Sequence, residues 1–216
     1  MSVAAATKSE PALAIVVDDD ESVRDAISEL LNSVGIDSLT FSSARELLDA
    51  ALPDRPGCLI LDVRMPGLSG IDLQQRLAES GISIPIVFLT GHGDIAMSVQ
   101  AMKAGAVDFL TKPVRDQNIL DAVSAAIATD IARRATETVS RRSQALYETL
   151  TPRERQVLRS VVTGAMNKQI AFDLDITEVT VKLHRSSMMK KMQATSITHL
   201  LSVWQSLPAD VRSGEG

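Results

Sequence analysis

The chain has 216 residues, which exceeds one small domain and suits two domains of modest size. Its composition is 45% hydrophobic and 23% charged, which excludes intrinsically disordered and collagen-like classes of protein. The single cysteine, Cys58, cannot form an internal disulfide, and the 3 scattered histidines lack the spacing of zinc ligands. These features predict a two-domain globular protein without a structural zinc.

The formal net charge of −5 is divided unevenly along the chain. Residues 1–129 contain 9 basic and 18 acidic side chains, whereas residues 130–216 contain 13 basic and 9 acidic ones. The acidic first part suits a domain that binds cations, and the basic second part suits one that contacts polyanions such as nucleic acid. The longest early apolar run, residues 12–17, is too short for a membrane span or a signal peptide, so we expect a cytoplasmic protein with no membrane partner.

The first part alternates short apolar runs with amphipathic stretches. The runs are nearly continuous in hydrophobic residues, as buried strands of a parallel sheet are, and they predict strands over residues 12–17, 36–41, 58–61, 84–90 and 107–111. The stretches between them predict helices over residues 21–34, 43–51, 71–80 and 95–104, with a last one from about residue 117. Five such units predict an α/β domain with a flavodoxin-like, doubly wound, five-stranded parallel sheet in the order 2-1-3-4-5.

This alternation stops near residue 130. Residues 130–149 carry arginines and few large apolar residues, which predicts a helical linker able to continue the fifth helix. A Thr-Pro-Arg-Glu capping box then begins the first of four predicted helices, and this helix ends near residue 164. The other three are predicted over residues 167–174, 178–192 and 197–207. We therefore expect an α/β domain over 12–129 and a small all-α four-helix domain over 150–207, with flexible ends at 1–11 and 208–216.

Polar residues follow the predicted strands at the points where the strands end. The aspartate triplet 18–20 follows the first strand and Asp62 follows the third, while Thr90 ends the fourth strand and Lys112 follows the fifth. The carboxyl ends of parallel strands meet at one edge of a sheet, where ligands of doubly wound folds bind. In the predicted strand order, Asp19 and Asp62 are neighbours at this edge.

Neighbouring carboxylates raise each other's pKa unless a cation lies between them, and Mg²⁺ prefers such oxygen ligands. With the metal in place, Asp62 is a suitable nucleophile toward a phosphoryl group whose oxygens Lys112 and Thr90 stabilise. Taken singly, Asp20 or Ser22 is explained as the N-cap of a helix. The coincidence of four strand ends favours a functional site.

Four segments resemble the receiver domains of two-component response regulators, closely those of the FixJ type: VVDDDESVR, LDVRMPG, FLTGHGD and AMKAGAVDFLTKP. The resemblance covers about residues 12–128. It implies that Asp62 accepts a phosphoryl group from a partner histidine kinase, and that the chain catalyses only its own phosphoryl transfer and dephosphorylation. It also implies Mg²⁺ as cofactor, with Asp18, Asp19, Asp62 and the backbone carbonyl of Arg64 as ligands, Thr90 and Phe109 as switch residues, and Lys112 as the invariant lysine.

Residues 167–192 predict two helices joined by a tight turn. On the second helix, Val181, Met188 and Met192 fall at helical spacings that face a core, and the opposite side carries the polar residues Thr180, Lys182, Arg185, Ser186 and Lys190. Short polar and basic residues near an exposed helix N-terminus suit insertion into the major groove of DNA. The same pattern alone also fits an ordinary solvated helix.

The longer segment from Leu150 to about residue 207 resembles LuxR-type helix-turn-helix domains. The resemblance makes residues 178–192 the recognition helix, with Lys182, Leu183 and Ser186 facing bases and Thr180, His184 and Arg185 contacting the DNA backbone. Together the two resemblances imply a transcription factor that forms a homodimer on phosphorylation and binds double-stranded promoter DNA, with RNA polymerase as a further expected partner.

Two alternatives remain at this point. The triplet 18–20 also approximates the nucleophile motif of haloacid-dehalogenase-like phosphatases, which would make Asp18 the essential residue and leave Asp62 without a role. A regulator gated by a small ligand, like quorum sensors, would share the second domain. It would need an apolar cavity in the first part, where the sequence instead concentrates charged residues.

Overall fold

The computed structural model describes residues 11–91 and 95–213. It divides into two compact units, residues 1–134 and 135–216, which we call the amino-terminal and carboxy-terminal units and describe separately. The predicted flexible segment 1–11 lies almost wholly outside the described residues. Within the described part of the chain, no helix has the length and hydrophobicity needed to cross a membrane.

The amino-terminal unit is built on the predicted five-stranded parallel sheet. The strands pair in the order β2-β1-β3-β4-β5, which confirms the predicted topology. All residues of β1, β3 and β4 are buried, as their continuous apolar sequences require. The bounds are β1 Leu13–Val17, β2 Asp37–Phe41, β3 Gly57–Leu61, β4 Ile86–Thr90 and β5 Asp108–Thr111.

The start of β4 is later than predicted. The apolar run begins at Ile84, but β4 starts at Ile86, because Pro85 has no N–H to donate to a strand ladder. The carbonyl of Pro85 still accepts a hydrogen bond from the Leu59 N–H at 2.8 Å, so the proline lies at the edge of the pairing.

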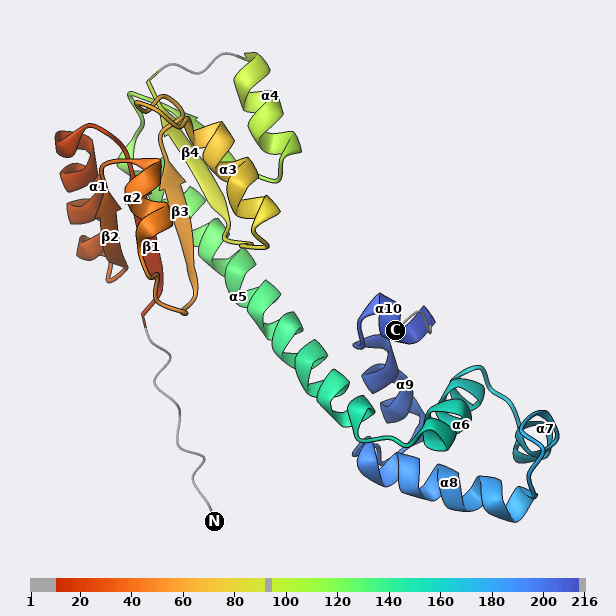
Figure 1. Cartoon of the computed structure of the whole chain (residues 1–216). Helices are drawn as coiled ribbons and strands as arrows, with labels where there is room; N and C mark the ends of the chain where they lie inside the picture. Colours follow the sequence, from red (N-terminus) through yellow and green to blue (C-terminus); the bar gives the residue numbers. More distant parts are fainter. Residues whose placement is uncertain (1–10, 92–94, 214–216) are drawn as a thin grey trace, which may run out of the picture. The chain divides into compact units, whose positions relative to one another are not determined.

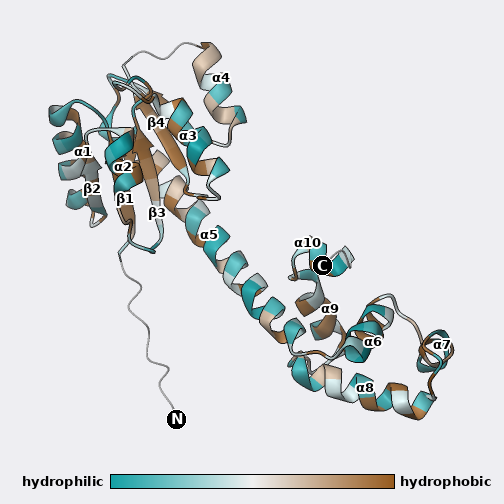
Figure 2. Cartoon of the chain, in the orientation of Figure 1, coloured by the Kyte–Doolittle hydropathy of each residue, from teal (hydrophilic) through white to brown (hydrophobic). Residues whose placement is uncertain are grey.

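Helices cover both faces of the sheet (Figure 1). One hydrophobic core joins the sheet to α1 and α5, and the other joins it to α2, α3 and α4. Figure 2 shows the strands as the most hydrophobic part of this unit, with hydrophilic residues along the outer sides of the helices. The bounds are α1 Glu21–Ser33, α2 Ala44–Asp49, α3 Gly70–Glu79, α4 Ile95–Lys103 and α5 Asp116–Glu148.

Helix α5 is one continuous helix of 33 residues, and its part up to Arg134 belongs to the amino-terminal unit. Asp130 is 1% exposed, and its carboxylate accepts hydrogen bonds from the Gly57 N–H at 3.0 Å and from Nε of Arg134 at 2.7 Å. Arg133 also donates to this carboxylate, at 3.1 Å. The predicted start of the linker at residue 130 is therefore corrected, because Asp130 is bonded to the first residue of β3 and the amino-terminal unit extends to Arg134.

The described residues of the carboxy-terminal unit, 135–213, form helices joined by short connections, with no strand among them. Its first helix, α6, begins with the predicted capping box, in which Thr151 and Glu154 exchange hydrogen bonds. The end of α5 adds Tyr147 to the hydrophobic core of this unit. The bounds are α6 Pro152–Val162, α7 Asn167–Asp173, α8 Glu178–Lys191, α9 Ile197–Gln205 and α10 Ala209–Ser213.

The prediction of a flexible tail from residue 208 is wrong for residues 209–213, which form α10. The Pro208 carbonyl accepts a hydrogen bond from the Arg212 N–H at 3.2 Å, which closes a helical turn. Leu207 is buried and Val211 packs against the core, so apolar contacts hold this short helix. The remaining residues of the predicted tail, 214–216, lie outside the described part of the chain.

Candidate functional site

Four of the predicted strand-end residues meet at one edge of the sheet. Asp18 and Asp62 follow β1 and β3, and they are only 3% and 6% exposed. The Asp62 N–H donates to the Val17 carbonyl at 2.9 Å, which continues the β1–β3 ladder by one residue. The ladder therefore fixes where the Asp62 side chain leaves the backbone. Thr90 at the end of β4 is also buried, and Lys112 follows β5.

Lys112 lies between the two carboxylates but closer to one of them. Its Nζ atom is 2.6 Å from Oδ2 of Asp18 and 3.9 Å from Oδ1 of Asp62. The other oxygen of Asp62 accepts a hydrogen bond from the Arg64 N–H at 2.9 Å, and the Thr90 hydroxyl also donates to this carboxylate. Asp62 is thus surrounded by hydrogen-bond donors, while its nearest cation is engaged with Asp18.

The electrostatic surroundings raise the pKa of Asp62 above its ordinary value. Burial is the largest cause, and the negative charge of Asp18 acts in the same direction. Lys112, Thr90 and the Arg64 N–H each lower the pKa, but together they do not cancel the effect of burial. The Asp62 carboxylate is therefore short of positive charge, as expected of a group whose function requires a further cation or a reacting phosphoryl group.

The donor chemistry of this edge suits a hard cation, but the predicted ligands are not all gathered. Asp18 and Asp62 offer carboxylate oxygens, whereas Asp19 is exposed. Arg64 follows Asp62 by two residues, with its side chain exposed. Within residues 11–91 and 95–213, no group of three or more His, Cys, Asp or Glu residues is close enough to hold a metal ion.

The predicted switch aromatic, Phe109, lies on β5 and is half-buried. Its ring centroid is 5.9 Å from that of Phe88 on β4, with the planes tilted by 41°. Phe88 itself is fully buried in the core on the α2–α4 face of the sheet. Phe109 therefore contacts a buried ring on one side and is partly exposed to solvent on the other. It lies on β5, the strand that Lys112 follows.

Two contacts to the site were not predicted. The guanidinium of Arg24 donates to the Asp18 carbonyl at 2.8 Å, from the first turns of α1. Gly70 opens α3, and its N–H donates to the Val63 carbonyl at 3.0 Å. A Cβ atom at this position would lie 2.2 Å from the Asp62 carbonyl oxygen, so only glycine fits. A glycine at the start of an otherwise good helix is the sequence signal for such a close approach.

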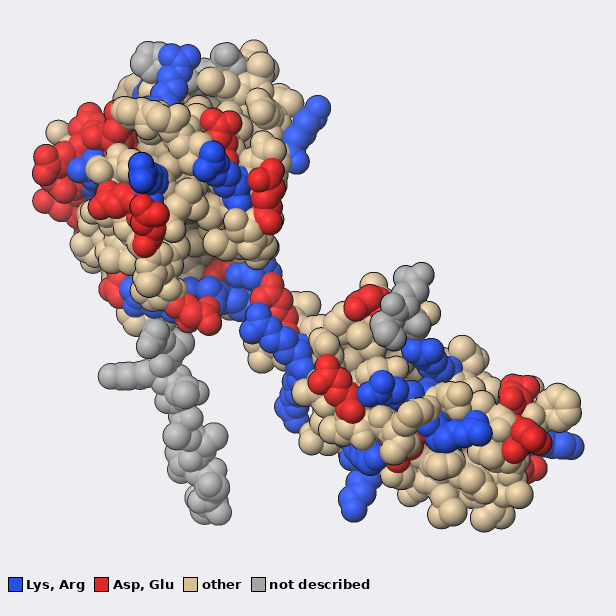
Figure 3. Space-filling model, viewed as in Figure 1, with Lys and Arg blue, Asp and Glu red and all other residues tan. Residues whose placement is uncertain are grey.

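The second candidate site is the exposed face of α8. Val181 and Met188 are fully buried, which confirms the predicted core face of this helix, and Met192 just after the helix is buried with them. The opposite face is solvent-exposed and includes Leu183, which is 66% exposed despite its hydrophobic side chain. Figure 3 shows basic side chains along α5. The exposed predicted residues are Lys182, Leu183, Ser186 and Lys190.

The other three predicted DNA-contacting residues are half-buried. Arg185 donates from Nη1 to Oδ1 of Asn167 on α7 at 2.9 Å, and this bond ties the two helices of the motif together. Thr180 shares a hydrogen bond of 2.9 Å with the N-cap residue Thr177. His184 lies beside them on the same helix. The predicted set therefore divides into a fully exposed group and a group placed at the side of the helix.

Glu154 holds α8 against α6, a role that sequence reasoning missed. It is 4% exposed, and its carboxylate accepts from Lys191 Nζ at 2.7 Å, from the Thr151 N–H at 2.8 Å and from the Ser187 hydroxyl. Burial alone would raise its pKa, but these donors outweigh burial and lower the pKa to about 2. The capping box was predicted from the sequence, whereas the link from its glutamate to α8 has no local signal.

Comparisons with known proteins identify the families to which the two units belong. The family model described as "Response regulator receiver domain" matches residues 14–124, and that described as "Bacterial regulatory proteins, luxR family" matches residues 148–204. The relative "Nodulation protein W" of Bradyrhizobium diazoefficiens is 51% identical over 199 residues, covering 92% of this chain and 88% of its own length. "Transcriptional regulatory protein FixJ" of Rhizobium meliloti is 44% identical over 186 residues, covering 86% of this chain and 91% of its own.

Two solved structures extend this similarity over both units. The response regulator StyR aligns with a TM-score of 0.80 at 45% identity, covering 90% of this chain and 98% of that chain. Full-length FixJ from B. japonicum aligns with a TM-score of 0.54 at 38% identity, covering 96% and 99%. The chain therefore belongs to the two-component response regulators that join a receiver domain to a LuxR-type helix-turn-helix DNA-binding domain.

Proposed function

We propose that Asp62 accepts a phosphoryl group from a histidine kinase, and that this modification promotes homodimerisation and binding of promoter DNA in the cytoplasm. The observation that carries the proposal is the position of Asp62 at the sheet edge, buried and hydrogen-bonded to Thr90 with Lys112 close by. Its raised pKa reflects a shortage of positive charge that a phosphoryl acceptor needs supplied at the time of reaction.

In the proposed reaction, one oxygen of the Asp62 carboxylate forms a bond to phosphorus. The bond between phosphorus and the donor's imidazole nitrogen breaks, and its electron pair stays on that nitrogen. Lys112 neutralises the oxygens of the transferring group, and the Thr90 hydroxyl donates a hydrogen bond to one of them. Positioning and charge neutralisation of this kind are most of what phosphoryl transfer requires. The chain thereby takes part in a transfer without being an enzyme that turns over a separate substrate.

We propose that Mg²⁺ is the cofactor of this step. Asp18, Asp19, Asp62 and the backbone carbonyl of Arg64 would hold it, and it would supply the positive charge that Asp62 lacks. Mg²⁺ should raise the melting temperature of the protein by mass action, and Asp19→Asn should remove most of that shift. Because Asp19 is exposed, this substitution tests metal binding without disturbing the core. Equal shifts in both proteins would exclude the site.

The proposed switch runs from Asp62 through Thr90 and Phe109 to the surface of α4. Phosphorylation replaces the single negative charge of the Asp62 carboxylate with nearly two on the phosphoryl group, which Thr90 can follow because it already donates to that carboxylate. Helix α4 exposes hydrophobic side chains, as a surface that packs against a second copy does. They are Ile95, Val99 and Met102.

On DNA, we propose that the exposed face of α8 enters the major groove. Lys182, Leu183 and Ser186 would face bases, and Lys190 with the half-buried Thr180, His184 and Arg185 would contact the backbone. RNA polymerase is a further proposed partner of the DNA-bound dimer. Lys182→Ala should reduce the preference for one DNA sequence over another. Arg185→Ala should weaken binding to all DNA sequences and reduce the slope of log affinity against log salt concentration by about one.

The deciding experiment measures sedimentation and operator binding of the full chain with and without an acyl-phosphate donor. We expect the donor to shift the protein to a dimer and to tighten binding, because two half-sites then act together. Asp62→Asn should remain in the untreated state throughout. Identical behaviour with and without donor would contradict the switch and leave the DNA-binding assignment standing.

A further inference from the structure

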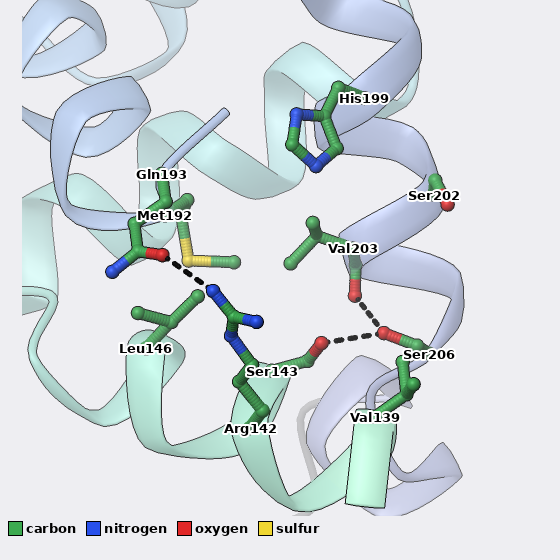
Figure 4. Close-up of a pocket in the computed structure, with 10 residues that line it drawn as sticks. All are labelled: Val139, Arg142, Ser143, Leu146, Met192, Gln193, His199, Ser202, Val203 and Ser206. Atoms are coloured by element: carbon green, nitrogen blue, oxygen red, sulfur yellow. Dashed lines mark hydrogen bonds between the residues drawn. The ribbon is translucent and has the colours of Figure 1, made fainter. Parts of the chain in front are cut away.

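The carboxy-terminal unit contains a pocket of about 470 Å³ that no part of the proposed function uses (Figure 4). It lies between the last turns of α5, the turn after α8, and α9, and all of its lining residues belong to this unit. Its polar lining residues are Arg142, Ser143, Gln193, His199, Ser202 and Ser206. None of the lining residues is acidic.

Arg142 is the only arginine or lysine among the lining residues, and its hydrogen-bond partner is neutral. Its Nη2 atom donates to Oε1 of Gln193 at 3.0 Å, as the dashed line in Figure 4 shows. In the described part of the chain, no carboxylate pairs with this guanidinium. The preceding residue differs, since Arg141 lies 3.8 Å from the carboxylate of Glu137. A guanidinium held only by an amide keeps its capacity to bind an anion.

Hydroxyl and imidazole groups line the same pocket as this guanidinium. The hydroxyls of Ser143 and Ser206 are 2.7 Å apart, and that of Ser206 is 2.8 Å from the Val203 carbonyl. The Nδ1 atom of His199 lies 3.5 Å from the Thr195 backbone nitrogen. The side chains of His199 and Ser202 are both exposed at the rim. The rim therefore offers several donors to one bound anion.

The floor of the pocket is apolar. Met192 is fully buried there, and the half-buried side chains of Leu146 and Val203 lie beside it. Inorganic phosphate would use only the rim and leave this floor in contact with water. A carboxylate attached to a small apolar group would use both parts, and the volume is within the range of small-molecule sites.

We propose that this pocket binds a small organic acid, with the carboxylate on Arg142 and the rim hydroxyls and the apolar part over Leu146, Met192 and Val203. Such a ligand links the end of α5 and α9 to Gln193, which follows α8 and has a left-handed backbone conformation with φ of 52°. Because α8 is the proposed recognition helix, an effect of the ligand on DNA affinity rests on the proposed function. Binding of the ligand does not depend on it.

Calorimetric titration of the full chain with benzoate tests the proposal, with benzamide as the uncharged probe of the same shape. We expect saturable binding of benzoate to the native chain. Benzamide should bind about tenfold or more weakly than benzoate, and Arg142→Gln should weaken benzoate binding by a similar factor, since each change removes a charge-assisted hydrogen bond. Arg141→Gln is the matched control and should leave benzoate affinity unchanged. Ser202→Glu places a carboxylate at the exposed rim and should abolish binding while the far-UV circular dichroism stays unchanged.

Four results would overturn the proposal: no saturable binding of benzoate, equal binding of benzamide, equal losses in the Arg141 and Arg142 variants, or displacement of benzoate by inorganic phosphate at similar concentration. None of these measurements uses a phosphoryl donor or DNA. A failure here would therefore leave the phosphorylation and DNA-binding proposals untouched, and a failure of those proposals would leave this one standing.

Discussion

Each unit buries an acidic side chain near a lysine, and the two acids differ in how completely they are partnered. Glu154 in the carboxy-terminal unit accepts from Lys191, Ser187 and Thr151, and its pKa falls to about 2. Asp62 in the amino-terminal unit is also buried, but Lys112 lies 3.9 Å away and its pKa is raised. We expect this difference to separate an acid that stabilises the fold from one that, in the proposed function, is kept available for reaction.

The largest expected effect concerns covalent labelling. Treatment with an acyl-phosphate donor and Mg²⁺ should add one phosphoryl group to the native chain and to the Glu154→Gln variant, because Glu154 is fully engaged in structural contacts. Asp62→Asn should abolish the label entirely. Intact-mass measurement followed by mapping of the labelled peptide checks this. A label at Asp18 or Asp20 would support the phosphatase interpretation of the aspartate triplet instead.

The next effect concerns stability. Glu154→Gln should destabilise the carboxy-terminal unit by about 2 kcal/mol, because it removes the charged partner of Lys191, whose side chain is 34% exposed and therefore partly screened by solvent. Urea unfolding followed by tryptophan fluorescence reports on this unit alone, since the single tryptophan, Trp204, lies in it. Asp62→Asn should leave that unfolding transition where it is. A shift of less than about 1 kcal/mol for Glu154→Gln would remove the structural side of the comparison.

The two acids should respond to pH with opposite signs. The pKa of Glu154 is lowered from 4.5 to about 2, so the contribution of its charge to the free energy of unfolding is complete above pH 4.5 and is lost as the pH falls toward 2. The pKa of Asp62 is raised from 3.8, so the contribution of its protonated form to the free energy of unfolding is complete below pH 3.8. This contribution is lost as the pH rises through the higher pKa of the folded state.

Urea midpoints of the native chain and of Glu154→Gln should therefore converge as the pH approaches 2, when followed by Trp204 fluorescence. For the amino-terminal unit, urea unfolding is followed by far-UV circular dichroism. The urea midpoint of Asp62→Asn should exceed that of the native chain by the largest amount at neutral pH. A constant difference across the pH range, for either pair, would mean that the substituted group acts through packing and not through its charge.

The smallest expected effect is that of Ser187→Ala. It removes one neutral donor from Glu154 and leaves Lys191 and Thr151 in place, so the carboxy-terminal unit should lose about 1 kcal/mol. Ser186→Ala on the exposed face of α8 is the matched control and should have no effect on the urea midpoint. Equal losses in the two variants would indicate a change in helix propensity and not the loss of this hydrogen bond.

The parts of the molecule that follow from local sequence were predictable. Strands β1, β3 and β4 follow from continuous apolar runs, and the meeting of Asp18, Asp62, Thr90 and Lys112 follows from the fact that parallel strands end at one edge. The buried face of α8 follows from the spacing of its apolar residues.

The contacts that were missed connect residues far apart in sequence. Asp130 accepts from Gly57, Glu154 accepts from Lys191, and Arg185 donates to Asn167. None of these pairs is marked by a local pattern, because each requires two elements already packed together. Helix α10 was missed for the related reason that Pro208 is a break in sequence terms, while the contact of Val211 with the core decides its structure.

Gly70 determines how much sequence variation the surroundings of Asp62 tolerate. Any side chain at this position must displace either the start of α3 or the Asp62 carbonyl, which leaves 2.2 Å for a Cβ atom. In a library that varies every position singly, substitutions here should yield proteins that accumulate normally in the cell yet fail to respond to their kinase. A residue without a side chain would then be as intolerant of change as Asp62, the proposed phosphoacceptor.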